Sequence, residues 1–232
     1  MSNLKRNGMR RWAPSYLRNR GHLSKAQRRA LREQWPSYGV ELRHAQTCPL
    51  SELFSDFESI HLELGFGHGE VLLHRAEINP QRGFLGIEAH RPAIATVLRQ
   101  LEKAPLPNIK LIRGDALLML HDHLVADRLF DDISILFPDP WPNDHSRRIL
   151  RESTLPLFGK FLSPLGTIRF ASDVDDYVHQ VISITQHQCN WSARSGSKNW
   201  RPVTRYEQKG INERRLPVEL WLHRNHSLIE KS

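Results

Sequence analysis

Short apolar runs alternate with helix-like patterns along most of the chain. Six of these runs predict β-strands, at residues 60–64, 84–88, 109–112, 133–137, 167–171 and 218–222. Apolar residues at helical spacing fill 71–78, which Asn79-Pro80 ends, and also the segment that Pro92 opens. Strands separated by helix-length segments favour a Rossmann-like α/β fold, with a mostly parallel central sheet and helices on both faces.

The strands divide the chain into two segments. Residues 50–232 are expected to form one α/β domain, and residues 1–49 an N-terminal arm that is partly flexible but patterned from Leu23 to Trp35. No apolar run is long enough to span a bilayer, and the N-terminus lacks the apolar segment of a secretory signal. We therefore expect a cytoplasmic protein that contacts no membrane and is a monomer or a weak homodimer.

Cysteine and histidine give little reason to expect a metal. The two cysteines, Cys48 and Cys189, are too few for a disulfide framework or a zinc site. The pair His121 and His123 lacks accompanying Cys or carboxylate ligands. We predict no bound metal.

Positive charge is concentrated in the arm. The chain has a net charge of +8, yet residues 1–32 alone carry ten Lys and Arg and no Asp or Glu. Trp12, Tyr16 and Trp35 lie among or just after these charges and are able to stack on bases. The pattern favours contact with a nucleic acid over the alternative of a merely solubilising tail.

The turn after the first strand is rich in glycine, with Gly65, Gly67 and Gly69 at alternate positions. Glycines at this place allow a tight turn and a close approach of a ligand to the backbone. The spacing differs from the dinucleotide fingerprint, and Glu70 stands where its last glycine would be. A nicotinamide-dependent dehydrogenase is therefore disfavoured.

Acidic residues follow the ends of successive strands. Glu63 lies in the first strand, Glu88 ends the second and Asp115 follows the third. Such acids are able to bind ribose hydroxyls and an exocyclic amine, which suits a cofactor with an amino acid end, a ribose and an adenine but no phosphate. S-adenosylmethionine has this composition. The alternative, that the acids are helix caps and solvated loop residues, becomes weaker when several fall at successive strand ends.

The fourth strand ends in an unusual loop, Pro138-Asp139-Pro140-Trp141. Two prolines restrict the loop and fix the direction of the Asp139 carboxylate. A stiff turn with Trp141 packed on the core would explain the prolines but not the acid. Asp139 is thus the candidate catalytic residue.

Together these motifs resemble the bacterial tRNA (guanine-N7)-methyltransferase family. The matching blocks are RGHLSKAQRRAL (20–31), LELGFGHGE (62–70), FLGIE (84–88), HRP (90–92), RGDA (113–116), FPDPW (137–141), ASD (171–173) and TRYEQKG (204–210). The resemblance implies a class I methyltransferase fold that methylates a guanine in the tRNA variable loop, position 46. It also implies cofactor contacts from Glu63, Glu88, Asp115 and Asp139, with the glycines of the turn, and nucleoside contacts from Asp173, Thr204, Arg205, Tyr206 and Glu207.

The chain departs from the family after Trp141. Asn143 stands at a substrate-binding position where the family has lysine, and the segment before Arg147 is about two residues shorter. A catalytically impaired paralogue that binds RNA on a methyltransferase fold is therefore the alternative function. Basic residues expected along the phosphate path are Arg147, Arg148, Arg194, Lys198, Arg201, Arg205, Arg214 and Arg215.

Overall fold

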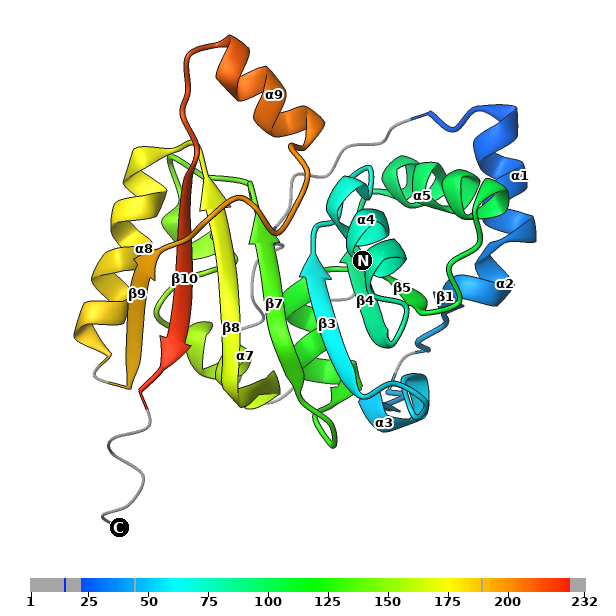
Figure 1. Cartoon of the computed structure of the whole chain (residues 1–232), viewed down its shortest axis with the longest axis horizontal. Coiled ribbons are helices and arrows are strands. Elements are labelled where there is room, and N and C mark those ends of the chain that lie inside the picture. Colours follow the sequence, from blue (N-terminus) through cyan, green and yellow to red (C-terminus); the bar gives the residue numbers. More distant parts are fainter. Residues whose placement is uncertain (1–14, 16–21, 44, 189, 226–232) are drawn as a thin grey trace, which may run out of the picture.

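An eight-stranded sheet forms the centre of the computed structural model, which describes residues 15, 22–43, 45–188 and 190–225 (Figure 1). Its strands in spatial order are β1 (Gly39–Val40), β5 (Ile109–Arg113), β4 (Arg82–Glu88), β3 (Ser59–Leu64), β7 (Phe130–Leu136), β8 (Leu162–Ser172), β10 (Val218–Arg224) and β9 (Trp191–Ser195). The first six run parallel, and β10 is antiparallel to both β8 and β9. All six predicted strands are confirmed.

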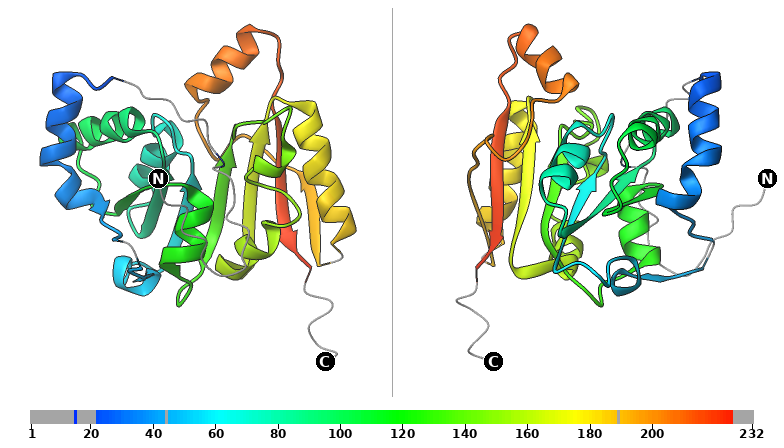
Figure 2. Two further views of the ribbon diagram at one scale, coloured as in Figure 1. Left: turned by 180° about the vertical axis from the view of Figure 1, so that it is seen from behind. Right: turned by 45° about the vertical axis from the view of Figure 1, so that its right-hand side comes forward.

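Helices cover both faces of this sheet (Figures 1 and 2). In Figure 1, α4 (Glu70–Ile78) and α5 (Arg91–Lys103) lie in front, whereas α7 (Leu155–Phe161) and α8 (Asp175–His187) lie behind. The chain adds β4 and β5 on one side of β3 and then β7 and β8 on the other, so right-handed crossovers place the two sets of helices on opposite faces. The predicted α/β fold is confirmed. Above the carboxyl ends of the strands stands α9 (Arg205–Asn212), which the hydrophobic pattern did not predict.

The remaining elements are short. They are α1 (Lys25–Glu33), α2 (Trp35–Tyr38), α3 (Leu50–Leu53), α6 (Ala116–Leu118), the π-helical turn η1 (Met119–His123), the 3-10 turn η2 (His145–Arg147) and a parallel pair, β2 (Cys48–Pro49) with β6 (Leu124–Val125). The pairing of β7 with β8 has a register shift between Phe130 and Asp132 of β7. Among the described residues, no helix has the length and apolar character needed to cross a membrane.

The described part of the arm packs against the elements expected to form the domain of residues 50–232. Helix α1 packs on α5, where Ala30 is buried and Arg29 pairs with Glu102 at 2.8 Å. β1 joins the edge of the central sheet beside β5. Residues 22–43 and 45–49 therefore belong to the same fold as the rest. Trp12, Tyr16, Cys189 and the basic residues Lys5, Arg6, Arg10, Arg11, Arg18 and Arg20 lie outside the described residues.

The two faces of the central strands differ in polarity. Ile60, Leu62 and Leu64 of β3 belong to the main apolar core, but His61 on the opposite face is fully buried among charges. Arg75 of α4 donates to both carboxylate oxygens of Asp132, at 2.8 and 3.0 Å, and His61 contacts the same carboxylate. Burial, together with Arg75, lowers the pKa of His61 to about 4, so the imidazole is neutral. A buried polar layer thus lies on one face of the sheet.

Candidate active site

The backbone of the turn after β3 borders open space. Gly65 and Gly67 adopt left-handed conformations (φ 71° and 54°), and a Cβ added at either would meet no atom within 4 Å. Gly69 differs, since a Cβ there would lie 2.5 Å from Val97 of α5. The first two glycines leave room for a ligand, as predicted for the turn, whereas Gly69 is required for packing.

Two of the predicted acids are held in place by backbone amides. Glu88 accepts from the amides of Gly67 at 3.0 Å and His90 at 2.7 Å. One oxygen of Asp115 caps α6, and the other accepts from the amide and hydroxyl of Ser15 at 2.8 and 3.1 Å. Ser15 thus occupies the acceptor that an adenine amine would use. Because a carboxylate has about four acceptor positions, Glu88, which accepts two hydrogen bonds, retains capacity for a ligand, whereas the four positions of Asp115 are filled by Leu117, Leu118 and Ser15.

A cavity of about 250 Å³ lies beyond the carboxyl ends of β3, β4, β5 and β7. Gly65, Glu88 and Asp139 of the predicted set line it, together with Gly114, Ala116 and Ser15. Asp115 does not line it, although its chain neighbours Gly114 and Ala116 do. Other walls come from His90 and Ile149, which were not predicted. His90 follows Glu88 directly, so the strand-end rule could have found it. Nothing in the sequence relates Ser15 to Asp115, one hundred residues away.

Glu63, Gly67 and Gly69 do not line this cavity. The Glu63 side chain lies on the polar face of β3, where burial raises its pKa to about 8 although Arg75 opposes the shift. One of its carboxylate oxygens has no hydrogen-bond partner among the described residues. The sequence prediction that Glu63 contacts the cofactor remains a proposal.

Strained backbone flanks Asp139 on both sides. Phe137 and Trp141 have left-handed conformations (φ 51° and 43°), each of which costs about 1–3 kcal/mol in a non-glycine residue. Two contacts hold the loop in this shape: the Phe137 amide donates to Ala171 at 2.8 Å, and Arg148 donates to the Pro140 carbonyl at 2.7 Å. The neighbouring elements thus keep the carboxylate of Asp139 at the cavity wall.

Arg148 was expected to contact RNA phosphates, but it is 0% exposed. Its guanidinium also donates to Gln180 and Asp176 of α8 and lies 4.6 Å from the ring centre of Tyr177. A buried guanidinium with these partners cannot reach a phosphate. The neighbouring Arg147 is half-buried and stacks on Trp141, 3.3 Å from the ring centre, so its predicted contact with RNA remains open.

The predicted nucleoside-binding residues lie next to Asp139. Asp173, at the end of β8, accepts from Arg215 at 2.7 Å. The Tyr206 ring packs on Phe137 at 5.5 Å between centres, yet 49% of the residue is exposed. Burial raises the pKa of the Tyr206 hydroxyl, and the carboxylates of Asp173 and Asp139 raise it further. The two carboxylates therefore both act on Tyr206, beside the cavity.

The first turn of α9 is organised by other contacts. Thr204 caps the helix through the amide of Glu207, and the buried Glu207 carboxylate accepts from Arg201 at 2.6 Å and Lys198 at 3.2 Å. Arg201 is buried too, which removes it from the phosphate path. Arg205 is exposed and lies 3.6 Å from Glu70. The geometry places Glu207 and Thr204 where they position α9.

The loop after Trp141 is open to solvent, and Asn143 and Asp144 are both exposed. Among the described residues, no group of three or more His, Cys, Asp or Glu side chains converges as metal ligands would.

Known proteins similar to this chain include methyltransferases. A family model described as "Putative methyltransferase" matches residues 58–220, which includes the glycine turn, Glu88, Asp115, Asp139 and Asp173. A tRNA (guanine-N(7)-)-methyltransferase of Nitrosococcus oceani is 38% identical over 84% of both chains. Another, from Halorhodospira halophila, is 32% identical over 86% of this chain and 89% of its own. The chain belongs to the tRNA (guanine-N7)-methyltransferase family.

Solved structures extend the comparison of the fold. The 16S rRNA methyltransferase KamB superposes with a TM-score of 0.57 at 15% identity, covering 75% of this chain and 91% of that one. A 30S ribosomal methyltransferase from an uncultured bacterium gives a TM-score of 0.51 at 17% identity, covering 81% and 98%. At these identities the likeness shows the methyltransferase fold alone.

The cavity of this methyltransferase suits S-adenosylmethionine. Open space above Gly65 and Gly67 accommodates a ligand against the backbone, and Glu88 presents acceptor positions for hydroxyl donors. A ligand amine would reach Asp115 only by replacing Ser15 as its donor. His90 contributes an imidazole nitrogen that is buried and without a partner among the described residues.

Proposed function

We propose that this protein transfers a methyl group from S-adenosylmethionine to N7 of a guanine in the variable loop of tRNA, at position 46. The observation that carries the proposal is the position of Asp139. Asp139 lines the cofactor cavity. Its carboxylate, like that of Asp173, raises the pKa of the half-exposed Tyr206. Donor cavity, catalytic acid and a ring able to stack on a base are therefore adjacent.

The chemistry asks mainly for alignment. Guanine N7 has an in-plane lone pair and no proton, and the cofactor supplies an activated methyl group, so the protein needs no strong general base. Holding nucleophile and donor in line supplies most of the rate, with electrostatics adding to it. Methylation leaves positive charge on the purine. Asp139 and Asp173 stabilise that charge and accept from the N–H donors of guanine.

Position within the site suggests separate tasks for the other residues. Glu88 and Asp115 hold the cofactor's ribose and adenine, while the exposed face of Tyr206 stacks on the target base. The exposed Arg205 and the half-buried Arg147, which stacks on Trp141, contact tRNA phosphates. Asn143 is exposed beside Trp141, in place of the family's lysine, and meets the substrate there with a neutral side chain.

Radiolabelled methyl transfer to tRNA that lacks the modification tests the proposal, with the product mapped to its nucleotide. We expect Asp139→Asn to lower kcat by about 100-fold or more, as loss of one transition-state contact does, while the Kd of the cofactor changes little. Asp175→Asn, which removes an exposed carboxylate on α8, serves as the control and keeps full activity.

Equal losses in kcat and in cofactor affinity would reduce Asp139 to a binding residue. Wild-type protein that binds both tRNA and cofactor but transfers no methyl group would favour the alternative, an RNA-binding module with an impaired site. The shared family and the intact acids of the cavity argue against this alternative.

We also propose tRNA as the physiological partner, the cytoplasm as the compartment, and a monomer or weak homodimer as the working form. The arm's charge supports the first, because ten basic residues without an acid suit a polyanion. Light scattering of the protein with and without tRNA checks the oligomeric state.

A further inference from the structure

A second cavity, of about 240 Å³, lies at the β1 edge of the sheet, and we call it the edge pocket. Its apolar walls include Trp35 of α2, Leu42 after β1, and Met119 of η1. Arg91 of α5 and Arg113 of β5 contribute the polar part of the lining, together with Glu41. The edge pocket is similar in volume to the cofactor cavity and is not used by the mechanism above.

The two cavities share their dividing loops. His90 lines the cofactor cavity and Arg91, the next residue, lines the edge pocket. In the same way Arg113 lines the edge pocket and Gly114 the cofactor cavity. A ligand in the edge pocket would therefore lie next to the adenine end of the cofactor, on the side away from Asp139.

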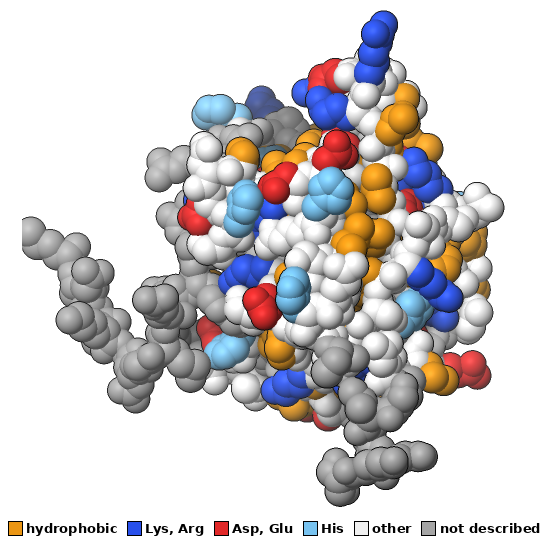
Figure 3. Space-filling view, turned by 90° about the vertical axis from the view of Figure 1, so that its left-hand side faces the viewer, with side chains coloured by type: hydrophobic (Ala, Val, Ile, Leu, Met, Phe, Trp, Pro, Cys, Tyr) orange, Lys and Arg blue, Asp and Glu red, His pale blue; other side chains and the backbone are white. Residues whose placement is uncertain are grey.

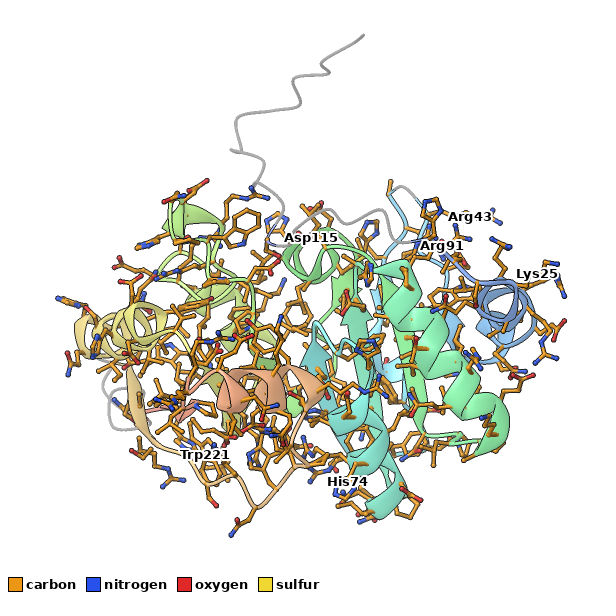
Figure 4. The ribbon with its side chains drawn as sticks, turned by 90° about the horizontal axis from the view of Figure 1, so that it is seen from above. Lys25, Arg43, His74, Arg91, Asp115 and Trp221 are labelled. Carbon is orange, nitrogen blue, oxygen red and sulfur yellow. The ribbon has the colours of Figure 1, made fainter. Side chains whose placement is uncertain are left out.

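Positive charge dominates this edge. The guanidinium groups of Arg91 and Arg113 form no hydrogen bond or ion pair with the described residues (15, 22–43, 45–188 and 190–225), and both residues are exposed. The one acid of the lining, Glu41, accepts from the indole of Trp35. Arg43 follows Leu42, and Figure 4, seen from above the carboxyl ends, shows Arg43 beside Arg91 and Lys25 beyond them, with Asp115 nearer the middle.

The neighbouring surface continues the charge. Helix α1 presents Lys25, Arg28 and Arg32 to solvent, with a single acid, Glu33, among its residues. Two unpaired guanidinium groups beside an indole and a thioether match a phosphodiester with an attached ribose and base, because guanidinium binds phosphate and aromatic rings stack on bases. A ligand that is only apolar would leave both charges unused.

We propose that the edge pocket binds one nucleotide unit of the tRNA substrate, with its phosphate on Arg91 and Arg113 and its base or ribose against Trp35 and Met119. The inference rests on the proposed function, in that tRNA is the ligand. The edge pocket anchors the strand on the far side of the cofactor from the target guanine. It therefore contributes to the affinity for tRNA and leaves methyl transfer itself unchanged.

Binding of tRNA to Arg91→Ala/Arg113→Ala tests the proposal, with filter binding at several salt concentrations. We expect Kd to rise about tenfold and the slope of log Kd against log salt to fall by about 2, roughly 1 for each lost phosphate contact. The control is Arg99→Ala, which removes an exposed charge from the same helix about 12 Å further along. Unchanged tRNA affinity and slope in the double variant would overturn the proposal.

A second measurement uses the wild-type chain and so does not depend on the folding of a variant. Phenylglyoxal modifies accessible arginines, and mass spectrometry reports the rate at each site. Bound tRNA should slow modification of Arg91 and Arg113 while Arg99 reacts as before. If bound tRNA leaves the modification rates of Arg91, Arg113 and Arg99 all unchanged, tRNA does not occupy the edge pocket. Protection of Arg91 and Arg113 by guanosine monophosphate but not by tRNA would also contradict the proposal.

These outcomes separate the edge pocket from the proposed reaction. Because both measurements record binding, they are valid even if methyl transfer fails. Conversely, a double variant that binds tRNA like the wild type, in a protein that methylates tRNA normally, removes the edge pocket and leaves the proposed function intact.

Discussion

Arg147 and Arg148 are adjacent in sequence but differ in environment, and Arg148→Lys tests the difference. Lysine keeps the positive charge, so a phosphate contact would survive the change, since lysine binds phosphate as a point charge. It cannot reproduce the planar fork that donates to Pro140, Gln180 and Asp176 at once. The substitution therefore distinguishes a residue that binds RNA from one that positions the Asp139 loop.

The magnitude follows from the three contacts. Gln180 and Asp176 are exposed or nearly so and regain water, whereas the Pro140 carbonyl loses a hydrogen bond from a charged donor, worth about 1.5–3 kcal/mol. We expect a loss of about 2–3 kcal/mol in the free energy of unfolding. Because the lost bond holds a strained loop, a shift of Asp139 should lower kcat by about 10- to 100-fold, with tRNA affinity unchanged.

Urea unfolding, single-turnover methyl transfer and tRNA filter binding give the three readouts. Arg147→Ala is the comparison variant, and it should show the opposite pattern: a weaker Kd for tRNA, a salt slope lower by about 1, and near-normal stability. If Arg148→Lys equals the wild type in stability and kcat, the hydrogen bond from Arg148 to Pro140 does not hold the Asp139 loop in place. A lower salt slope in Arg148→Gln would show that Arg148 reaches RNA after all.

Three further changes have defined outcomes. Burial raises the pKa of Glu63 to about 8, so Glu63 is protonated in the folded protein and ionised in the unfolded chain between pH 4.5 and 8. As the pH rises through this range, the free energy of unfolding should fall by about 1.4 kcal/mol per pH unit relative to that of Glu63→Gln. Free energies from urea unfolding that change equally with pH in both proteins would refute this. Tyr206→Leu should raise the KM for tRNA roughly 5- to 100-fold through lost stacking while Tyr206→Phe stays near normal, as steady-state kinetics will show. Deleting residues 1–14, which carry Lys5, Arg6, Arg10 and Arg11, should flatten the salt dependence of tRNA binding but spare cofactor affinity in calorimetry, because Ser15 at the cofactor cavity and helix α1 remain.

The sequence predicted the parallel core of the fold well because each strand is a short apolar run. β1 was missed for a physical reason: two residues give no periodicity, and Gly39–Val40 is a strand only because β5 lies beside it. The charge of the arm likewise gives no sign that Ala30 is buried and that α1 packs on α5.

The sequence indicated residues near the cavity where the backbone sets their position, but not the residues whose position depends on side-chain partners. Strand-end acids such as Glu88 and the proline-flanked Asp139 follow from topology, and both line the cavity. Glu207 and Arg201 were assigned to substrate and phosphate, but they bind each other in the interior. No sequence pattern separates an arginine that faces solvent from one that is paired and buried, since the partner lies on another element.

The polar face of the sheet and the strained loop have a common consequence. Asp132, Arg75 and Arg169 occupy a layer where most sheets have apolar packing, and Arg169 lies between the rings of Trp200 and Trp221. The view in Figure 3 shows basic and apolar side chains intermixed on the flank of the molecule. Buried charges with several fixed partners resist rearrangement, because each displaced partner would leave an uncompensated charge. A reaction that needs alignment and no proton transfer benefits from this rigidity: the strands on which the polar layer lies are the ones that end in the glycine turn, the Asp139 loop and Asp173.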